Sequence, residues 1–209
     1  VYTHKLLDEI SIQVFLLERG MDDIKVINKK RFTRSMKKFS VVFGFRDRDL
    51  ERVKRCLDSL GKQTFKDFEV FFVDYGSSSK LAGEAKRLCQ NYSFCEYIYS
   101  DSRGLPWSRS CALNIGIQRA RGEYVFTNDI DMLFPSRILE KLARILSRDS
   151  FLHVLANELP ESFPDWFNID RLSLKTFNQG GKGILIVPRE KLHEIGAYDE
   201  FYFHWGTED

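Results

Sequence analysis

Two aspartates, Asp129 and Asp131, stand one residue apart at the end of the apolar run YVFTNDIDMLF at residues 124–134. In extended backbone, residues two apart point to the same side of the strand. Both carboxylates would therefore face one way where a strand stops. Such a pair can hold a divalent metal ion with a phosphate behind it. It can equally be a loop that carries two acids, and the spacing by itself does not choose between the two.

Polar residues also follow three other apolar runs, each at the point where the run ends. The runs are SVVFGF at 40–45, FEVFFVD at 68–74 and CEYIYS at 95–100, and the polar clusters span 46–49, 74–79 and 101–103. Short continuous runs rich in β-branched and aromatic residues are typical of strands buried on both faces. We therefore predict a strand at each run, with polar side chains beyond its carboxyl end.

Segments with helical spacing of apolar residues separate these runs, at 48–63, 81–92 and 108–122, and a fourth strand is expected at 123–129. In the third helix, the residues expected to face inward are Cys111, Ala112, Ile115 and Ala120. The alternation predicts an α/β fold, an open and mostly parallel sheet with helices on both faces. Because such sheets bind ligands beyond the carboxyl ends of their strands, the four clusters should meet at one edge, which favours the metal interpretation.

The remainder of the chain is less regular. We expect an amphipathic helix at 136–148 with Ser136 as its N-cap, strands at 151–157 and 183–188, and a short helix at 189–196. Residues 158–181 are aromatic and rich in helix breakers, which is typical of a functional loop or lid.

Composition gives bounds rather than a function. The chain has 209 residues, 43% of them hydrophobic and 30% charged, with a net charge of +2. These values are ordinary for one compact domain and give no electrostatic footprint for nucleic acid. The basic run KKRFTRSMKK at 29–38 predicts a solvated linker, with contact to a membrane surface or an anionic partner as the alternative. No apolar stretch is long enough to span a bilayer.

The four cysteines show no C-x-x-C spacing, so we expect reduced thiols and a cytoplasmic, or membrane-associated cytoplasmic, protein. The residues before 40 are interpreted as an N-terminal appendage with a basic linker, 1–39.

Four motifs in order resemble the inverting GT-A glycosyltransferases of the family-2 type, and most of all the β-1,4-galactosyltransferase and chondroitin-polymerase branch. The motifs are FGFRDRD at 43–49, VDYGSSS at 73–79, SRSCALNIGIQRARGEYVFTNDID at 108–131 and NQGGKGILIVPREKLHEIGAYDEFYFHWGTED at 178–209. The resemblance implies the GT-A (nucleotide-diphospho-sugar transferase) fold. It also implies a nucleotide-sugar-binding half at 40–131 and an acceptor or catalytic half at 132–209.

The resemblance implies a UDP-sugar donor and a Mn²⁺ or Mg²⁺ ion that bridges its phosphates, a task for which oxygen ligands are suited. Asp131 would be the direct metal ligand, and Asp129 would face the ribose or a metal-bound water. Asp74 would accept a hydrogen bond from the uracil N–H, while Arg46 and Arg48 would pair with phosphate or flank the base. The implied donor-binding set also includes Phe45, Arg109, Asn128, Ile130, Gly181 and Trp205.

Inversion requires a base that takes the proton of the acceptor hydroxyl as it attacks the anomeric carbon. The resemblance gives this role to Asp209, with Glu208 binding acceptor or donor-sugar hydroxyls and Trp205 offering an apolar platform to a saccharide or other hydroxyl acceptor. The implied reaction is metal-dependent, inverting transfer of a hexose: galactose, N-acetylgalactosamine or glucose.

Several alternatives stay open from the residues. Arg46 and Arg48 could form surface ion pairs with Asp47 or Asp49, and Arg109 could be a helix-surface charge. Tyr75 stands where a second aspartate is usual, and Thr207 where glycine is usual. The family's further histidine ligand would follow Asp209; His204 could substitute for it, or could be a packed or surface residue. A catalytically weak or inactive nucleotide-sugar-binding module is therefore the alternative function, and a nucleotidyltransferase on a similar sheet is a third.

Overall fold

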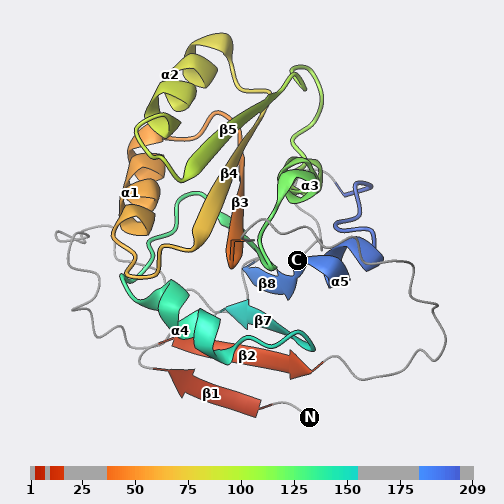
Figure 1. Cartoon of the computed structure of the whole chain (residues 1–209). Helices are drawn as coiled ribbons and strands as arrows, with labels where there is room; N and C mark the ends of the chain where they lie inside the picture. The colour runs from red at the N-terminus through yellow and green to blue at the C-terminus, as the bar shows by residue number, and fades with distance from the viewer. Residues whose placement is uncertain (1–2, 8–9, 17–36, 155–183, 203–209) are drawn as a thin grey trace.

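The structure is a computed structural model, and it describes residues 3–7, 10–16, 37–154 and 184–202. These residues form one eight-stranded sheet with the order β1-β2-β7-β8-β6-β3-β4-β5 and helices packed against it (Figure 1). The strands are β1 (Thr3–Leu7), β2 (Ile10–Leu16), β3 (Phe39–Phe45), β4 (Phe68–Tyr75), β5 (Cys95–Ser100), β6 (Tyr124–Asp129), β7 (Ser150–Val154) and β8 (Leu185–Pro188).

One half of the sheet consists of four adjacent parallel strands, β6, β3, β4 and β5. Every residue of β4 is buried, as continuous apolar runs predict for strands covered on both faces. Helices connect these strands in the predicted order. The α/β sheet with a parallel core, inferred from the alternation of strands and helices, is thereby confirmed.

Helices cover both faces of this sheet. They are α1 (Leu50–Gly61), α2 (Ser79–Cys89), α3 (Arg109–Arg119), α4 (Ile138–Ile145) and α5 (Arg189–Glu194). The apolar sides of α1, α2 and α4 pack into one core, and those of α3 and α5 into a second core on the opposite face.

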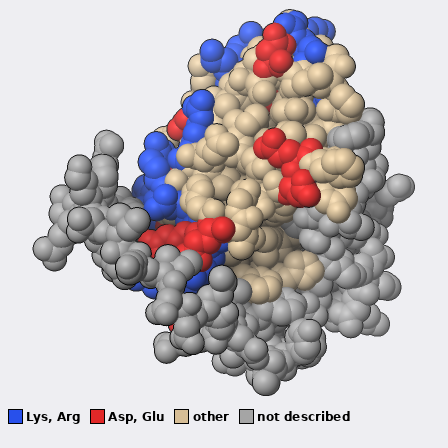
Figure 2. All heavy atoms as spheres, turned by 90° about the vertical axis from the view of Figure 1, so that its right-hand side faces the viewer, with Lys and Arg blue, Asp and Glu red and all other residues tan. Residues whose placement is uncertain are grey.

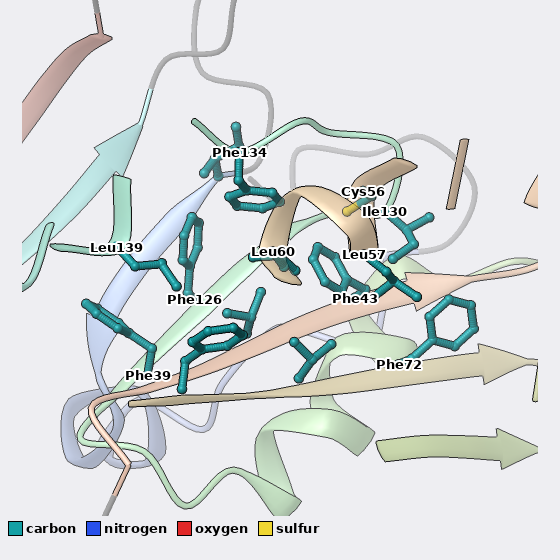
Figure 3. Packing of buried hydrophobic residues seen from close by; sticks show 14 of the residues in the cluster. Phe39, Phe43, Cys56, Leu57, Leu60, Phe72, Phe126, Ile130, Phe134 and Leu139 are labelled. Atoms are coloured by element: carbon teal, nitrogen blue, oxygen red, sulfur yellow. The ribbon is translucent and has the colours of Figure 1, made fainter. Parts of the chain in front are cut away.

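The larger core is built around phenylalanines that the strands send to one face. Phe43 and Phe126, from neighbouring strands, both make edge-to-face contacts with Phe134, which follows β6 in the chain (Figure 3). Leu57 and Leu60 of α1 lie over the same cluster and are fully buried. This packing fixes the loop after β6 against α1.

Helix α3 packs unusually close to the sheet because Gly116 lies at the contact. A Cβ atom at Gly116 would stand 2.4 Å from Cγ1 of Val42 and 3.2 Å from Cγ2 of Val73. No side chain fits at that distance, so glycine allows the helix to lie directly on β3 and β4. The position of the α3 N-terminus relative to the strand ends depends on this contact.

The other half of the sheet is antiparallel: β1 pairs with β2, β2 with β7, β7 with β8, and β8 with β6. The first two strands belong to the region expected to be an appendage, and they extend the sheet beyond β7. No helix among the described residues is long and apolar enough to cross a membrane.

Local details correct two expectations. Ser136 is not the N-cap of α4, which starts after Arg137 without a side-chain cap; the carbonyl of Ser136 instead accepts a 2.8 Å hydrogen bond from the backbone N–H of Thr64. On α3, Cys111 and Ile115 are only half-buried, and the inward face is formed by Ala112, Leu113, Gly116, Ile117 and Ala120. The helix is rotated from the expected orientation because Gly116, rather than Ile115, meets β3.

Candidate active site

The carboxyl ends of the four parallel strands meet at one edge of the sheet. Phe45 of β3 is in register with Asp74 of β4, and Gly44 with Asp129 of β6. Asp74 in turn is in register with Tyr99 near the end of β5. The polar clusters that the sequence placed after separate strands are therefore neighbours.

The loop after β3 is held by the loops after β4 and β5. The guanidinium of Arg46 donates to the carbonyl oxygens of Leu105 and Ser102, at 2.9 and 3.2 Å. Asp47 has a left-handed backbone with φ of 47°, its N–H donates to Oγ of Ser77, and its Oδ1 accepts from the N–H of Ser78. A non-glycine residue in this conformation is uncommon and persists where its surroundings hold it.

Neither Arg46 nor Arg48 forms the alternative ion pair with Asp47 or Asp49 within the part of the chain that the structure describes. Arg46 is occupied by backbone carbonyls, and Arg48 is exposed with no hydrogen bond or ion pair to another described residue. Asp49 instead caps α1, where its Oδ1 accepts from the N–H of Glu51 at 2.9 Å. The charge of Arg48 is thus open to an anion at this edge.

Asp74 is completely buried at the end of β4. Its Oδ1 accepts a 2.9 Å hydrogen bond from the N–H of Ser77, and its Oδ2 accepts a 2.7 Å hydrogen bond from the hydroxyl of Tyr97. Burial and this bond to a carboxylate raise the pKa of Tyr97 above its ordinary value. A carboxylate has acceptor capacity beyond two hydrogen bonds, yet in this arrangement Asp74 orders the loop that follows it.

Phe45, Asn128 and Ile130 direct their side chains into the protein. Phe45 packs on Phe72 at 4.9 Å between ring centroids and is fully buried. The Oδ1 of Asn128 accepts from the N–H of Asp129 at 2.8 Å, and Ile130 lies in the larger core (Figure 3). Contacts of these three residues with a ligand would involve their backbone.

Arg109, in the first turn of α3, faces the end of β6. Its Nε lies 3.4 Å from Oδ1 of Asp129; the Arg109 side chain is 12% exposed and that of Asp129 is 47% exposed. The start of α3 is fixed by Ser108, whose Oγ accepts from the N–H of Cys111. Arg109 is therefore a half-enclosed cation beside the acid pair, rather than a charge on the outer surface of the helix.

Asp131 differs from Asp129 because it is exposed and has no hydrogen bond or ion pair with any described residue. Its charge is near Cys56 of α1; burial first, and then Asp131, raise the pKa of that thiol well above its ordinary value. A negative charge without a counter-ion at the end of a strand is suited to an incoming cation.

Asp129 and Asp131 are the two oxygen donors that the sequence proposed for a metal ion. Among the described residues, no group of three or more histidine, cysteine, aspartate or glutamate side chains could hold one. Hard cations such as Mn²⁺ and Mg²⁺ accept one or two carboxylates when phosphate oxygens and waters complete the shell. β6 ends at Asp129, and Ile130 and Asp131 lie in a turn, so the extended backbone expected to direct both carboxylates to one side stops before Asp131. The exposed Asp131 is suited to such an ion when a diphosphate accompanies it.

Four of the expected site residues, Gly181, Trp205, Glu208 and Asp209, lie outside the described residues, as do His204 and the proposed lid at 158–181. Their roles stay predictions.

Sequence reasoning missed several residues that shape this edge. Tyr97 holds Asp74, and Ser77 ties the loops after β3 and β4 together. Asn114 lies within the motif at 108–131 but was given no role there; it binds the segment after α5. Its position in a half-buried helix, five residues after Arg109, was the available signal.

The view in Figure 2, from the right-hand side of Figure 1, shows how charge is distributed on one face. Lysine and arginine side chains gather mainly along one margin, Asp and Glu form separate groups, and much of the described surface between them is neutral.

Comparison with curated proteins finds glycosyltransferases. An uncharacterized glycosyltransferase of Rickettsia conorii is 26% identical over 166 residues, which are 71% of this chain and 26% of the relative. The uncharacterized glycosyltransferase YibD of Escherichia coli is 24% identical over 145 residues, 69% of this chain and 36% of the relative. The chain thus spans about a quarter to a third of the length of these relatives.

Solved structures show the same fold. TarS 1–349 of S. aureus, in complex with UDP-GlcNAc, has a TM-score of 0.58 at 18% identity, covering 82% of this chain and 51% of that one. The mannosyltransferase PcManGT of Pyrobaculum calidifontis, in complex with GDP-Man and Mn²⁺, has a TM-score of 0.55 at 19% identity, covering 79% of this chain and 48% of that one.

The expected GT-A architecture is confirmed by these neighbours. The match to the family model described as "Glycosyl transferase family 2" covers residues 40–192, most of the chain and all four parallel strands, and the chain therefore belongs to glycosyl transferase family 2.

Proposed function

We propose that this chain carries out metal-dependent, inverting transfer of a hexose from a UDP-sugar to an acceptor hydroxyl. The observation that carries the proposal is the grouping at the end of β6: Asp131 open to solvent, Asp129 half-exposed, and Arg109 beside it. Two acids and a cation at the carboxyl edge of a parallel sheet are suited to a diphosphate and its metal ion.

In this proposal, Asp131 is the direct ligand of Mn²⁺ or Mg²⁺, and Asp129 faces the ribose or a metal-bound water. The ion, when bound, stabilises the charge that develops on the leaving diphosphate. Arg109 and Arg48 add positive charge for the phosphates, and a guanidinium suits that task because its fork matches phosphate oxygens.

Recognition of uracil is proposed for Asp74. Asp74 lies at the correct strand end, but both of its oxygens are engaged and the side chain is buried. The structural neighbours bind different nucleotides, since one is in complex with GDP-Man and another with UDP-GlcNAc. A comparison of uridine and guanosine donors therefore tests the nucleobase and the hexose.

Glu208 and Asp209 are proposed to bind the acceptor and to take its proton, and Gly181 and Trp205 to contact the donor and the acceptor sugar. These roles rest on the motif at 178–209, as does the resemblance to the galactosyltransferase and chondroitin-polymerase branch. The four free cysteines support a reducing, cytoplasmic location, and membrane contact through 29–38 stays part of the proposal.

The experiment that tests the proposal is calorimetric titration of UDP with and without Mn²⁺. We expect Mn²⁺ to strengthen UDP binding, and Asp131→Asn to weaken it by about tenfold, which corresponds to about 1.4 kcal/mol. Asp149→Asn, another exposed aspartate, is the control and should bind as wild type does. Unchanged affinity in Asp131→Asn would remove Asp131 from the metal site.

A second measurement separates transfer from binding. UDP release is followed with UDP-galactose, UDP-N-acetylgalactosamine, UDP-glucose and GDP-mannose, each with and without saccharide acceptors. Release that depends on an acceptor supports the transferase. Tight UDP binding without release from any donor supports the alternative, a nucleotide-sugar-binding module.

A further inference from the structure

The segment from Tyr198 to Tyr202, which follows α5, lies against α3 and β6 (Figure 1). The chain runs on from Tyr202 to Glu208 and Asp209, six and seven residues later. Whatever fixes residues 198–202 therefore fixes the point from which the proposed catalytic acids extend.

The main anchor of this segment is the side-chain amide of Asn114. Its Nδ2 donates to the carbonyl oxygen of Tyr198 at 2.8 Å and to Oε1 of Glu200 at 2.9 Å, while its Oδ1 accepts from the N–H of Tyr198 at 3.0 Å. Both amide hydrogens are thus used, and the residue is only 7% exposed. We call these three residues the Asn114 clamp.

The orientation of the amide is determined by its partners. A flipped amide would place its oxygen against the carbonyl of Tyr198 and the carboxylate of Glu200, and its NH₂ group against an N–H. Such an arrangement loses three hydrogen bonds and creates repulsion at a buried site, where unsatisfied polar groups are costly. The clamp therefore has one low-energy geometry.

Two further contacts join the same segment to the donor side of the site. The Oγ of Ser108, the N-cap of α3, donates to the carbonyl of Tyr202 at 3.0 Å. The hydroxyl groups of Thr127 and Tyr198 lie 2.7 Å apart. Ser108 immediately precedes Arg109, and Thr127 is two residues before Asp129, so the segment contacts both elements that present the acid pair and its arginine.

We propose that Asn114 is a positioning residue: it holds residues 198–202 at a fixed place relative to the start of α3 and the end of β6, and this placement sets the rate of transfer to an acceptor. The inference rests on the proposed function for its catalytic consequence, whereas the clamp itself is a structural feature. Asn114 lies on the side of α3 that faces the segment after α5, so its loss should affect transfer far more than nucleotide binding.

The test is Asn114→Asp, which keeps the size of the side chain but replaces the donating NH₂ group by an oxygen facing Tyr198 O and Glu200. We expect hydrogen exchange at 198–202 to speed up by about tenfold or more, because the segment loses both bonds that the Asn114 amide donates and the new carboxylate repels the carbonyl oxygen of Tyr198 and the carboxylate of Glu200. Acceptor-dependent kcat should fall by about tenfold or more, while the Kd for UDP in Mn²⁺ stays within about twofold of wild type.

Rescue comes from the double variant Asn114→Asp/Glu200→Gln, in which the new amide at 200 donates to the new carboxylate at 114. It should restore part of the exchange protection and part of kcat, a recovery that simple damage to α3 would not produce. Gln118→Glu, an amide-to-acid change at an exposed position of the same helix, is the matched control and should behave as wild type does.

The outcomes are distinguishable. Unchanged exchange at 198–202 in Asn114→Asp overturns the clamp, and a parallel loss of UDP affinity and kcat shows that Asn114 acts on the fold of α3 instead. If the wild-type chain transfers no sugar, the proposed function fails; in that case the exchange measurement and its rescue by Glu200→Gln still support or overturn the clamp.

Discussion

The hydroxyl of Tyr97 donates a 2.7 Å hydrogen bond to Oδ2 of Asp74, so that β5 and β4 share one buried carboxylate at the edge where the strands end. Oδ1 of the same carboxylate holds the N–H of Ser77, and Oγ of Ser77 accepts from the N–H of Asp47. A chain of hydrogen bonds thus runs from β5 through β4 to the loop after β3. Shared polar networks of this kind make the placement of each loop depend on the others.

Removal of the Tyr97 hydroxyl tests this network. Tyr97→Phe should lower the free energy of unfolding by about 1.5 to 3 kcal/mol, the usual worth of a hydrogen bond to a charged group. Urea denaturation at neutral pH measures it. Tyr99→Phe is a control on the same strand, because the Tyr99 hydroxyl is 3.4 Å from its acceptor, Ser77 O, and the residue is exposed. Equal effects of both changes would contradict the special role of Tyr97.

The same pair predicts how stability depends on pH. Burial, followed by the bond to Asp74, raises the pKa of Tyr97, so the folded state holds this proton more tightly than the unfolded chain does. The resulting stability is fully present below the unfolded pKa of about 10 and is lost as pH rises further toward the folded pKa. Wild-type stability should therefore fall above about pH 10, and Tyr97→Phe should fall less steeply. The midpoints of urea unfolding of wild type and Tyr97→Phe, measured as pH is raised through that range, test this prediction.

Arg109 and Arg119 occupy opposite ends of α3 and offer a matched pair for the donor site. Arg109 faces Asp129, whereas Arg119 pairs with Glu96 at the far end of the helix. Arg109→Met should weaken UDP binding by about tenfold or more in Mn²⁺, since a charge-assisted bond to phosphate is worth about 1.5 to 3 kcal/mol. Arg119→Met should leave it unchanged. Calorimetry with UDP measures both, and the proposed phosphate role fails if the two variants bind alike.

How far the sequence could predict this site depends on the range of the interactions. The strand ends and the start of α3 are local features: continuous apolar runs stop at Asp74 and Asp129, and Ser108 is a good N-cap. Once these elements are placed, the rule for parallel sheets brings Asp74 and Asp129 together. Their neighbourhood could therefore be predicted from the sequence.

Partners supplied from distant parts of the chain could not be predicted in the same way. Asp74 looked like an open acceptor because nothing in its motif shows that Tyr97, on the next strand, fills one oxygen. The pairing of β2 with β7 joins residues 10–16 to residues 150–154, and no local pattern encodes that contact. Ser136 is a residue type that commonly caps helices, but here its backbone carbonyl accepts a hydrogen bond from the N–H of Thr64.

Asp47 supplies a prediction about strain. Its φ of 47° is unfavourable for most side chains, and a hydrogen bond from the N–H of Ser78 to its Oδ1 offsets part of that strain. Asp47→Asn retains an acceptor and tolerates this backbone, so its stability should stay within about 0.5 kcal/mol of wild type. Asp47→Ala keeps the strain and loses the acceptor of an exposed hydrogen bond, and it should cost about 0.5 to 1.5 kcal/mol. Thermal unfolding compares them, and an alanine variant as stable as wild type would contradict the account.

The close packing of α3 on β3 at Gly116 gives the last prediction. A Cβ at Gly116 would stand 2.4 Å from Val42 Cγ1, whereas a Cβ at Gly83, in the interior of α2, would meet nothing within 4 Å. Alanine stabilises a helix interior by about 1 kcal/mol relative to glycine, so Gly83→Ala should raise the free energy of unfolding by up to that amount. Gly116→Ala gains the same propensity but forces α3 away from β3, and overpacking of this kind costs about 1 to 3 kcal/mol. Denaturation by urea should therefore show opposite signs for the two substitutions. Because the displaced helix begins at Arg109, Gly116→Ala should also weaken UDP binding, whereas Gly83→Ala should not. If Gly116→Ala stabilised the protein and left UDP binding intact, the close seat of α3 on β3 would not be what positions Arg109.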